Sequence, residues 1–158
     1  MVIISNVDIA DVQRHELQTE ANAKVGGYGM DKYCPVDEFK TYRVQLERQD
    51  WERMYLIGEF ARFTTGITGR VVDIDTKMLE ETTKSRVESF YQPPANSPFT
   101  PIDLRLTADL ALVIVSADAN SSPLILIDGN HRAIAQYIKF GAVSLIPAFL
   151  CQYRPLCR

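Results

Sequence analysis

The feature that most constrains the fold is an apolar run joined to a helix through a single glycine. Residues 124–127 (Leu-Ile-Leu-Ile) form an uninterrupted apolar run of strand length, which is typical of a buried β-strand. Gly129 follows almost at once, and apolar residues then recur with helical spacing as far as Phe140, before Gly141 closes the helix. A buried strand that turns tightly into an amphipathic helix is typical of α/β domains. The sequence therefore predicts an α/β fold.

Other apolar segments predict the rest of a central mixed sheet. Residues 102–106, 110–115 and 145–150 have the length and residue types of strands, and residues 2–9 suit a further N-terminal strand. The connections around residues 124–127 are short, so we expect the helix at 130–140 to pack directly on this sheet. A chain of 158 residues is expected to form one domain, 1–158.

Residues 35–92 are predicted to be a mainly helical insertion. Apolar positions at mixed three-to-four spacing predict helix over residues 35–63 and again over 73–91, where Asp75 or Thr76 would be the N-cap. Three prolines within residues 92–98 predict a loop after it. We expect this insertion to lie outside the core sheet and to cover one side of a ligand cleft.

Composition narrows the possible partners and the compartment. A net charge of −3 speaks against a protein that coats nucleic acid, although a local basic patch is compatible with it. We expect no membrane association, because no apolar run reaches the roughly 18 residues that span a bilayer. The N-terminus lacks the basic region of a signal peptide, and three scattered cysteines suggest free thiols. The expected location is the cytoplasm.

The turn after the central strand carries the most chemistry. A helix N-terminus offers unpaired N–H groups and a partial positive charge, Gly129 allows close approach, and His131 and Arg132 add directional donors. Asp128 is either a ligand-facing or metal-binding carboxylate or the helix cap. His131 and Arg132 are alternatively a buried structural pair. We expect a phosphate to be the partner of Arg132 rather than an internal carboxylate, so Arg132→Ala should abolish nucleotide binding and leave the fold intact.

The motif Asp128-Gly129-Asn130-His131-Arg132 resembles the D/G-G-x-H-R element of the ParB/sulfiredoxin superfamily. Gly141 and Ile146-Pro147 follow it, and Pro101-Ile102 precede it, in that family's order, so that roughly a third of the chain is covered. The resemblance implies a ParB/sulfiredoxin-like mixed sheet with flanking helices and a helical insertion at about 35–92. It also implies that these five residues bind the phosphates of a nucleotide, ATP, ADP or CTP, with Mg²⁺.

A second resemblance concerns Glu16, which follows His15 after the first strand. ParB-like free-serine kinases carry a His-Glu pair there, and the likeness implies that Glu16 is a general base. The alternative is a solvated helix carboxylate. Asn130 stands where sulfiredoxins have a catalytic cysteine, so sulfinic-acid reduction is not expected. Only residues 151–158 follow the last strand, so the helix-turn-helix of partition proteins is not expected either.

Three functions remain open at this stage. The first is a nucleotide-dependent phosphotransferase or NTP hydrolase, an ATP- or ADP-dependent kinase or nucleotidase, with Glu16 and His131 as catalytic residues and an unknown small-molecule or protein acceptor. The second is a nuclease or nucleic-acid-binding protein, which the acidic balance does not favour. The third is a non-catalytic phage- or plasmid-type modulator that binds another protein through the insertion at 35–92.

Overall fold

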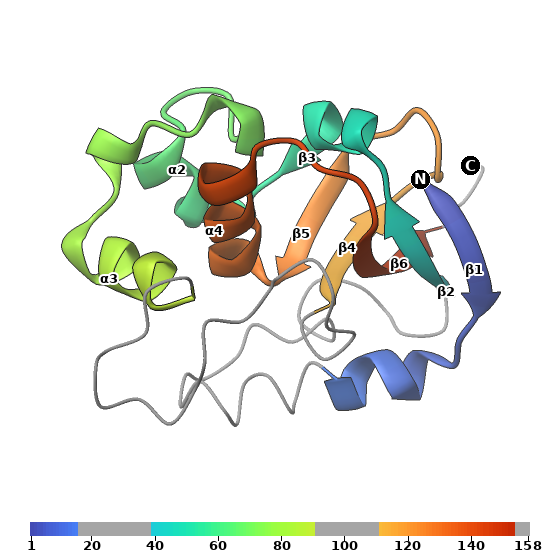
Figure 1. Cartoon of the computed structure of the whole chain (residues 1–158). Helices are drawn as coiled ribbons and strands as arrows, with labels where there is room; N and C mark the ends of the chain where they lie inside the picture. The colour runs from blue at the N-terminus through green and yellow to red at the C-terminus, as the bar shows by residue number, and fades with distance from the viewer. Residues whose placement is uncertain (16–38, 91–110, 154–158) are drawn as a thin grey trace.

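A six-stranded mixed sheet with flanking helices forms the centre of the computed structural model, which describes residues 1–15, 39–90 and 111–153 (Figure 1). The strands are β1 (Val2–Asn6), β2 (Phe39–Leu46), β3 (Met54–Tyr55), β4 (Leu112–Ser116), β5 (Leu124–Asp128) and β6 (Ile146–Tyr153). Their order across the sheet is β1-β2-β6-β4-β5-β3. The chain therefore has an α/β fold.

β4 lies between β6 and β5 in the sheet. β4 runs antiparallel to β5 and parallel to β6, so it lies between the strand that enters the helix α4 (Asn130–Phe140) and the strand that leaves it. On the outer sides, β3 runs parallel to β5, while β2 runs antiparallel to both of its neighbours, β1 and β6. The turn between β5 and α4 therefore adjoins the centre of the sheet.

Helices cover both faces of the sheet. On one face lies α4, and α2 (Gly58–Thr64) and α3 (Glu81–Ser89) lie beyond it (Figure 1). Three 3₁₀ helices connect these elements: η3 (Arg48–Arg53), η4 (Val71–Asp73) and η5 (Thr76–Met78). A helical segment at residues 9–15 packs Val12 against the opposite face. Within the described ranges, the helices are all too short or too polar to cross a membrane.

Two apolar clusters hold the layers together. The larger one buries Ile134 of α4 against Leu112, Ile114 and Leu126 of the sheet. The smaller one, on the other face, packs Val12 with residues such as Val113, Ile127 and Phe149. Side chains that alternate along β4 and β5 thus enter different clusters, because successive residues of a strand point to opposite faces.

The prediction of the strand, turn and helix is confirmed. The strands expected at 110–115, 124–127 and 145–150 correspond to β4, β5 and β6, apart from Leu110, and α4 begins and ends where expected. Gly141 is the C-cap of α4, with φ +71°, and its N–H donates to the Tyr137 carbonyl at 2.8 Å. The strand predicted at residues 102–106 lies outside the described residues.

The prediction of helix over residues 35–63 is wrong for β2. Phe39–Leu46 is a strand inside the main sheet, paired with β1 on one side and β6 on the other. Its buried residues are Thr41, Val44 and Leu46, at spacings of three and two. These spacings fit neither the 3.6-residue period of a helix nor the two-residue period of a strand. The partner strands resolved the ambiguity, because both edges of β2 make backbone hydrogen bonds to them. This segment is therefore part of the core and not of an insertion.

The remainder of the predicted insertion is only partly helical. α2 and α3 are short and joined by 3₁₀ helices, and β3 adds a sheet strand. Asp75 is an N-cap as expected, since its side chain accepts from the Lys77 N–H at 2.9 Å. It caps η5, however, while α3 begins later, at Glu81. Residues 35–38 and the proline-rich loop lie outside the described residues.

Candidate anion-binding site at the start of α4

Gly129 shapes the turn that joins β5 to α4. It has φ +90° and ψ +20°, a left-handed conformation in which glycine is strongly favoured. A Cβ at this position would lie 2.6 Å from Leu112 Cδ2 and 2.9 Å from Arg132 Nη2. Both the dihedral angles and the close packing therefore require glycine here.

Arg132 is held inside the protein by its own chain. Its Nη2 donates to Asp128 Oδ2 at 2.7 Å and to the Ala111 carbonyl at 3.3 Å, and the residue is only 8% exposed. The expectation that Arg132 would lack an internal carboxylate partner is therefore wrong. Asp128 lies four residues before Arg132, and the tight turn at Gly129 folds the guanidinium back over it. The geometry supports the alternative in which Arg132 is a buried structural residue. Its partner, however, is Asp128 and not His131.

Asn130 connects the turn to the neighbouring strand. Its Oδ1 accepts a hydrogen bond from the Ile57 N–H, just beyond β3, at 3.1 Å. No side chain caps α4, whose N-cap residue is Gly129. The N–H groups of Asn130, His131 and Arg132 belong to the first turn, where a helix supplies no acceptor of its own. These backbone donors, rather than the Asn130 side chain, are the groups suited to an anion.

His131 is largely buried and neutral at pH 7. Its ring packs edge-on against Phe60, with ring centroids 4.7 Å apart. Burial lowers the pKa of His131 to about 4, and the positive charges of Arg86 and Arg132 lower it further than the negative charge of Asp128 raises it. A neutral imidazole at this turn both donates and accepts hydrogen bonds, which is the property that proton transfer requires.

The pKa of His131 predicts how the stability of the fold changes with pH. The imidazole has a pKa of about 4 when folded and an ordinary value of 6.5 when unfolded. Between these values the unfolded chain binds more protons, so the stabilising contribution is complete above pH 6.5 and is lost as the pH falls toward 4. We expect the loss that His131 causes to be about 1–3 kcal/mol. Urea denaturation at several pH values should show it, and His131→Gln should flatten this part of the profile; a parallel profile in the variant would contradict the assignment.

Two buried polar groups beside this turn have no hydrogen-bond partner among the described residues. They are Arg132 Nε and the side-chain carboxamide of Gln136, a residue that is 3% exposed. Long side chains on a helix point back toward its N-terminus, so Gln136 extends from the next turn toward Arg132. Sequence reasoning did not single out Gln136. The available signal was a polar residue four positions after Arg132 on the sheet-facing side of the helix.

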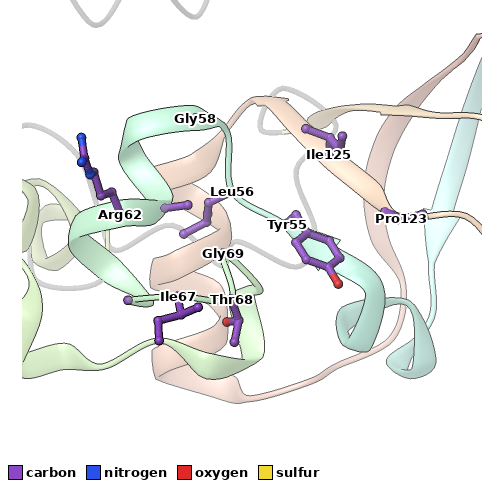
Figure 2. A pocket seen from close by; sticks show the side chains of 11 residues that line it. Tyr55, Leu56, Gly58, Arg62, Ile67, Thr68, Gly69, Pro123 and Ile125 are labelled. Atoms are coloured by element: carbon purple, nitrogen blue, oxygen red, sulfur yellow. The ribbon is translucent and has the colours of Figure 1, made fainter.

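A shallow groove of about 830 Å³ lies at the β3 edge of the sheet (Figure 2). It is formed by β3, α2, residues 66–69 and the start of β5, and its side chains include Tyr55, Arg62, Ile67 and Ile125. The predicted site residues Asp128 to Arg132 do not line it. Ile67 and Ile125 are exposed, which gives the groove a mainly apolar lining.

Two sequence-predicted features of the site remain, the general base Glu16 and a divalent cation. Glu16 lies outside the described residues, so its position relative to His131 stays a prediction. Within residues 1–15, 39–90 and 111–153, His, Cys, Asp and Glu side chains nowhere gather in a group of three that would hold a metal ion. Among the described residues, Asp128 is the carboxylate at the turn that could hold a divalent cation together with ligand oxygens.

Comparisons with protein-family models, with curated proteins and with solved structures returned no match to this chain.

Proposed function

We propose that the chain is a nucleotide-binding protein with a ParB/sulfiredoxin-like fold, and that it binds nucleotide phosphates at the start of α4. The observation that carries the proposal is the helix N-terminus itself: Gly129 is its N-cap, and no side chain occupies the first-turn N–H groups. Such a terminus favours an anion through its N–H donors and its partial positive charge. The neutral His131 adds a donor at the same turn.

The order of elements supports the ParB/sulfiredoxin-like assignment. Strand β5, the turn, helix α4, Gly141 and the Ile146-Pro147 start of β6 follow one another as the sequence motif requires. The fit to phosphate rests on two local features. The first-turn N–H groups of α4 carry no side-chain cap, and the buried polar atoms of Arg132 and Gln136 lack partners among the described residues. The fold family and the nucleotide are both proposals.

For the reaction we propose phosphotransfer or NTP hydrolysis. Glu16 would act as the general base and His131 as a proton donor or acceptor near the transferred phosphate. A bound Mg²⁺ would neutralise phosphate charge, and Asp128 is the carboxylate at the turn that would hold it. With a pKa of about 4 the imidazole of His131 is neutral and weakly basic at pH 7, so its main contribution would be a hydrogen bond to the phosphate.

Thermal unfolding with and without nucleotide tests the proposal. We expect ATP, ADP or CTP, with Mg²⁺, to raise the melting temperature, because a ligand at a hundred times its Kd stabilises a folded protein by about 2.7 kcal/mol. His131→Gln should reduce the shift, whereas Lys84→Gln, on the exposed side of α3, should leave it unchanged. Absence of a shift with every nucleotide at millimolar concentration would overturn the proposal.

The apolar groove favours a second candidate function, a modulator that binds another protein. Ile67 and Ile125 are exposed beside a hollow, and contiguous apolar surface of this kind often marks an interaction site. We expect Ile67→Asp to remove a co-purifying protein partner without lowering the melting temperature, because the side chain is fully exposed. If the partner binds wild type and Ile67→Asp equally, the groove is excluded as its binding site.

A further inference from the structure

The proposed phosphate site needs a cation, and Arg132 does not supply one. Its charge is neutralised by Asp128 at 2.7 Å, and its side chain is almost completely buried. The imidazole of His131 is neutral at pH 7. A helix N-terminus by itself provides only about half a positive charge, whereas a nucleotide phosphate chain carries several negative charges. Besides any bound Mg²⁺, a basic side chain from another element would complete the site, and this inference rests on the proposed function.

Helix α3 brings such a cation to the same end of α4. α3 lies beside the end of α4 that follows β5, and the two helices are in contact (Figure 1). Along α3, Val87 is buried and Thr83, Arg86, Glu88 and Phe90 are partly exposed; Thr83, Arg86, Val87 and Phe90 of this set follow helical spacing. Val87 is buried in the same apolar cluster as Ile134 of α4. Arg86 therefore lies at the margin of the surface that α3 presents to α4.

Arg86 differs from three other arginines of the described residues, each of which has a carboxylate partner. Arg70 is paired with Asp73, Arg53 with Asp50, and Arg132 with Asp128. The Arg86 side chain makes no hydrogen bond or ion pair with any residue in the described part of the chain, and it is only partly exposed. A half-buried guanidinium normally finds an anionic partner or a set of carbonyl groups. Here that partner is not supplied by the described residues.

Orphaned polar atoms at the turn point independently to a ligand. Arg132 Nε lies 3.1 Å from where a Cβ would stand on Gly129, and it is buried without a partner in the described ranges, as is the carboxamide of Gln136. Buried polar atoms in folded proteins are almost always hydrogen bonded. Their presence in α4 indicates a further polar group, such as a water that hydrates a bound phosphate, that the described residues do not contribute.

We propose that Arg86 of α3, and not Arg132, is the side chain that contacts the phosphates of the nucleotide held at the start of α4. Arg132 then acts as a positioning residue, because its contacts with Asp128 and the Ala111 carbonyl fix the turn on which the backbone donors stand. A guanidinium binds phosphate with two parallel hydrogen bonds. The ligand class is accordingly a nucleoside di- or triphosphate, whose affinity depends on Arg86, while adenosine binding does not depend on it.

Calorimetry with ATP, ADP and adenosine tests the proposal on four proteins: wild type, Arg86→Gln, Arg86→Lys and Lys84→Gln. Loss of a charge-assisted contact should weaken ATP and ADP binding about 10- to 100-fold in Arg86→Gln. Arg86→Lys should recover part of the affinity, and Lys84→Gln, on the exposed side of the same helix, should bind like wild type. If Arg86→Gln binds ATP as tightly as wild type, the role of Arg86 is refuted and the proposed function stands. If wild type binds no nucleotide, both the role of Arg86 and the proposed function are refuted.

The position of the Arg86 side chain can also be tested without a ligand. NMR titration of the two histidines should place the pKa of His131 near 4 in wild type, because burial and the Arg86 charge both lower it. Arg86→Gln should raise that pKa toward 6.5, and Lys84→Gln should leave it unchanged. An unaltered pKa in Arg86→Gln would show that the side chain does not face the turn, and would overturn the proposal even if ATP binding were weakened.

Discussion

Gly129→Ala is expected to lower the free energy of unfolding by about 2–5 kcal/mol. The left-handed backbone costs a non-glycine residue about 1–2 kcal/mol. The new methyl group would also stand 2.6 Å from Leu112 Cδ2 and 2.9 Å from Arg132 Nη2, and overpacking of this kind costs about 1–3 kcal/mol. Small domains are stable by only about 5–15 kcal/mol, so the loss should be obvious in urea denaturation at 25 °C.

Gly66→Ala is the matched control for this change. Gly66 also has a positive φ, +70°, but a Cβ there would meet nothing within 4 Å. Its substitution should therefore cost only the conformational part, about 1–2 kcal/mol. Equal losses in the two variants would show that the contacts of Gly129 with Leu112 and Arg132 do not contribute to stability. Nucleotide binding should be weakened by Gly129→Ala and unchanged in Gly66→Ala.

Asp128→Asn is expected to destabilise the fold by about 3–5 kcal/mol. The change leaves the guanidinium of Arg132, only 8% exposed, without its counter-charge, and breaking a buried ion pair from one side has a cost of this size. Arg132→Ala should cost somewhat less, about 2–4 kcal/mol, because the Asp128 side chain left behind is 24% exposed and remains partly hydrated. Arg132→Ala should therefore lower the stability of the fold, contrary to what the sequence motif suggested.

A double-mutant cycle distinguishes the effect of the Asp128–Arg132 contact from the effect of losing either charge on its own. The double variant Asp128→Asn, Arg132→Ala removes both partners, so it should be less destabilised than the sum of the single changes by about 0.5–3 kcal/mol. The exposed pair Arg14–Asp11, with an Arg14 Nη1 to Asp11 Oδ1 distance of 2.8 Å, is the control. Its disruption should cost at most about 1 kcal/mol. Additive effects at Asp128 and Arg132 would contradict a structural role for their contact.

The sequence by itself determined the elements whose pattern is local. The apolar run at 124–127 has no charge and is too short for an ordinary helix, while residues 130–140 have helical periodicity between two glycines. Both signals lie within one element and its caps, so α4 was predicted to the residue. The same reasoning located the turn Asp128 to Arg132 as the point where a chain presents backbone donors. These features need no distant partner to be recognised.

Tertiary structure alone decided the features that depend on contacts between distant segments. Phe39–Leu46 buries residues at spacings of three and two, so only pairing with β1 and β6 made it a strand. The role of Arg132 depended on the rotation of a turn around Gly129, which brings its guanidinium onto Asp128 and the Ala111 carbonyl. The charge of Arg86 acts on His131 because α3 packs beside α4, with Val87 buried in the core cluster. A sequence shows which groups carry charge, but burial and packing determine which of those charges are neutralised within the fold and which remain for a ligand.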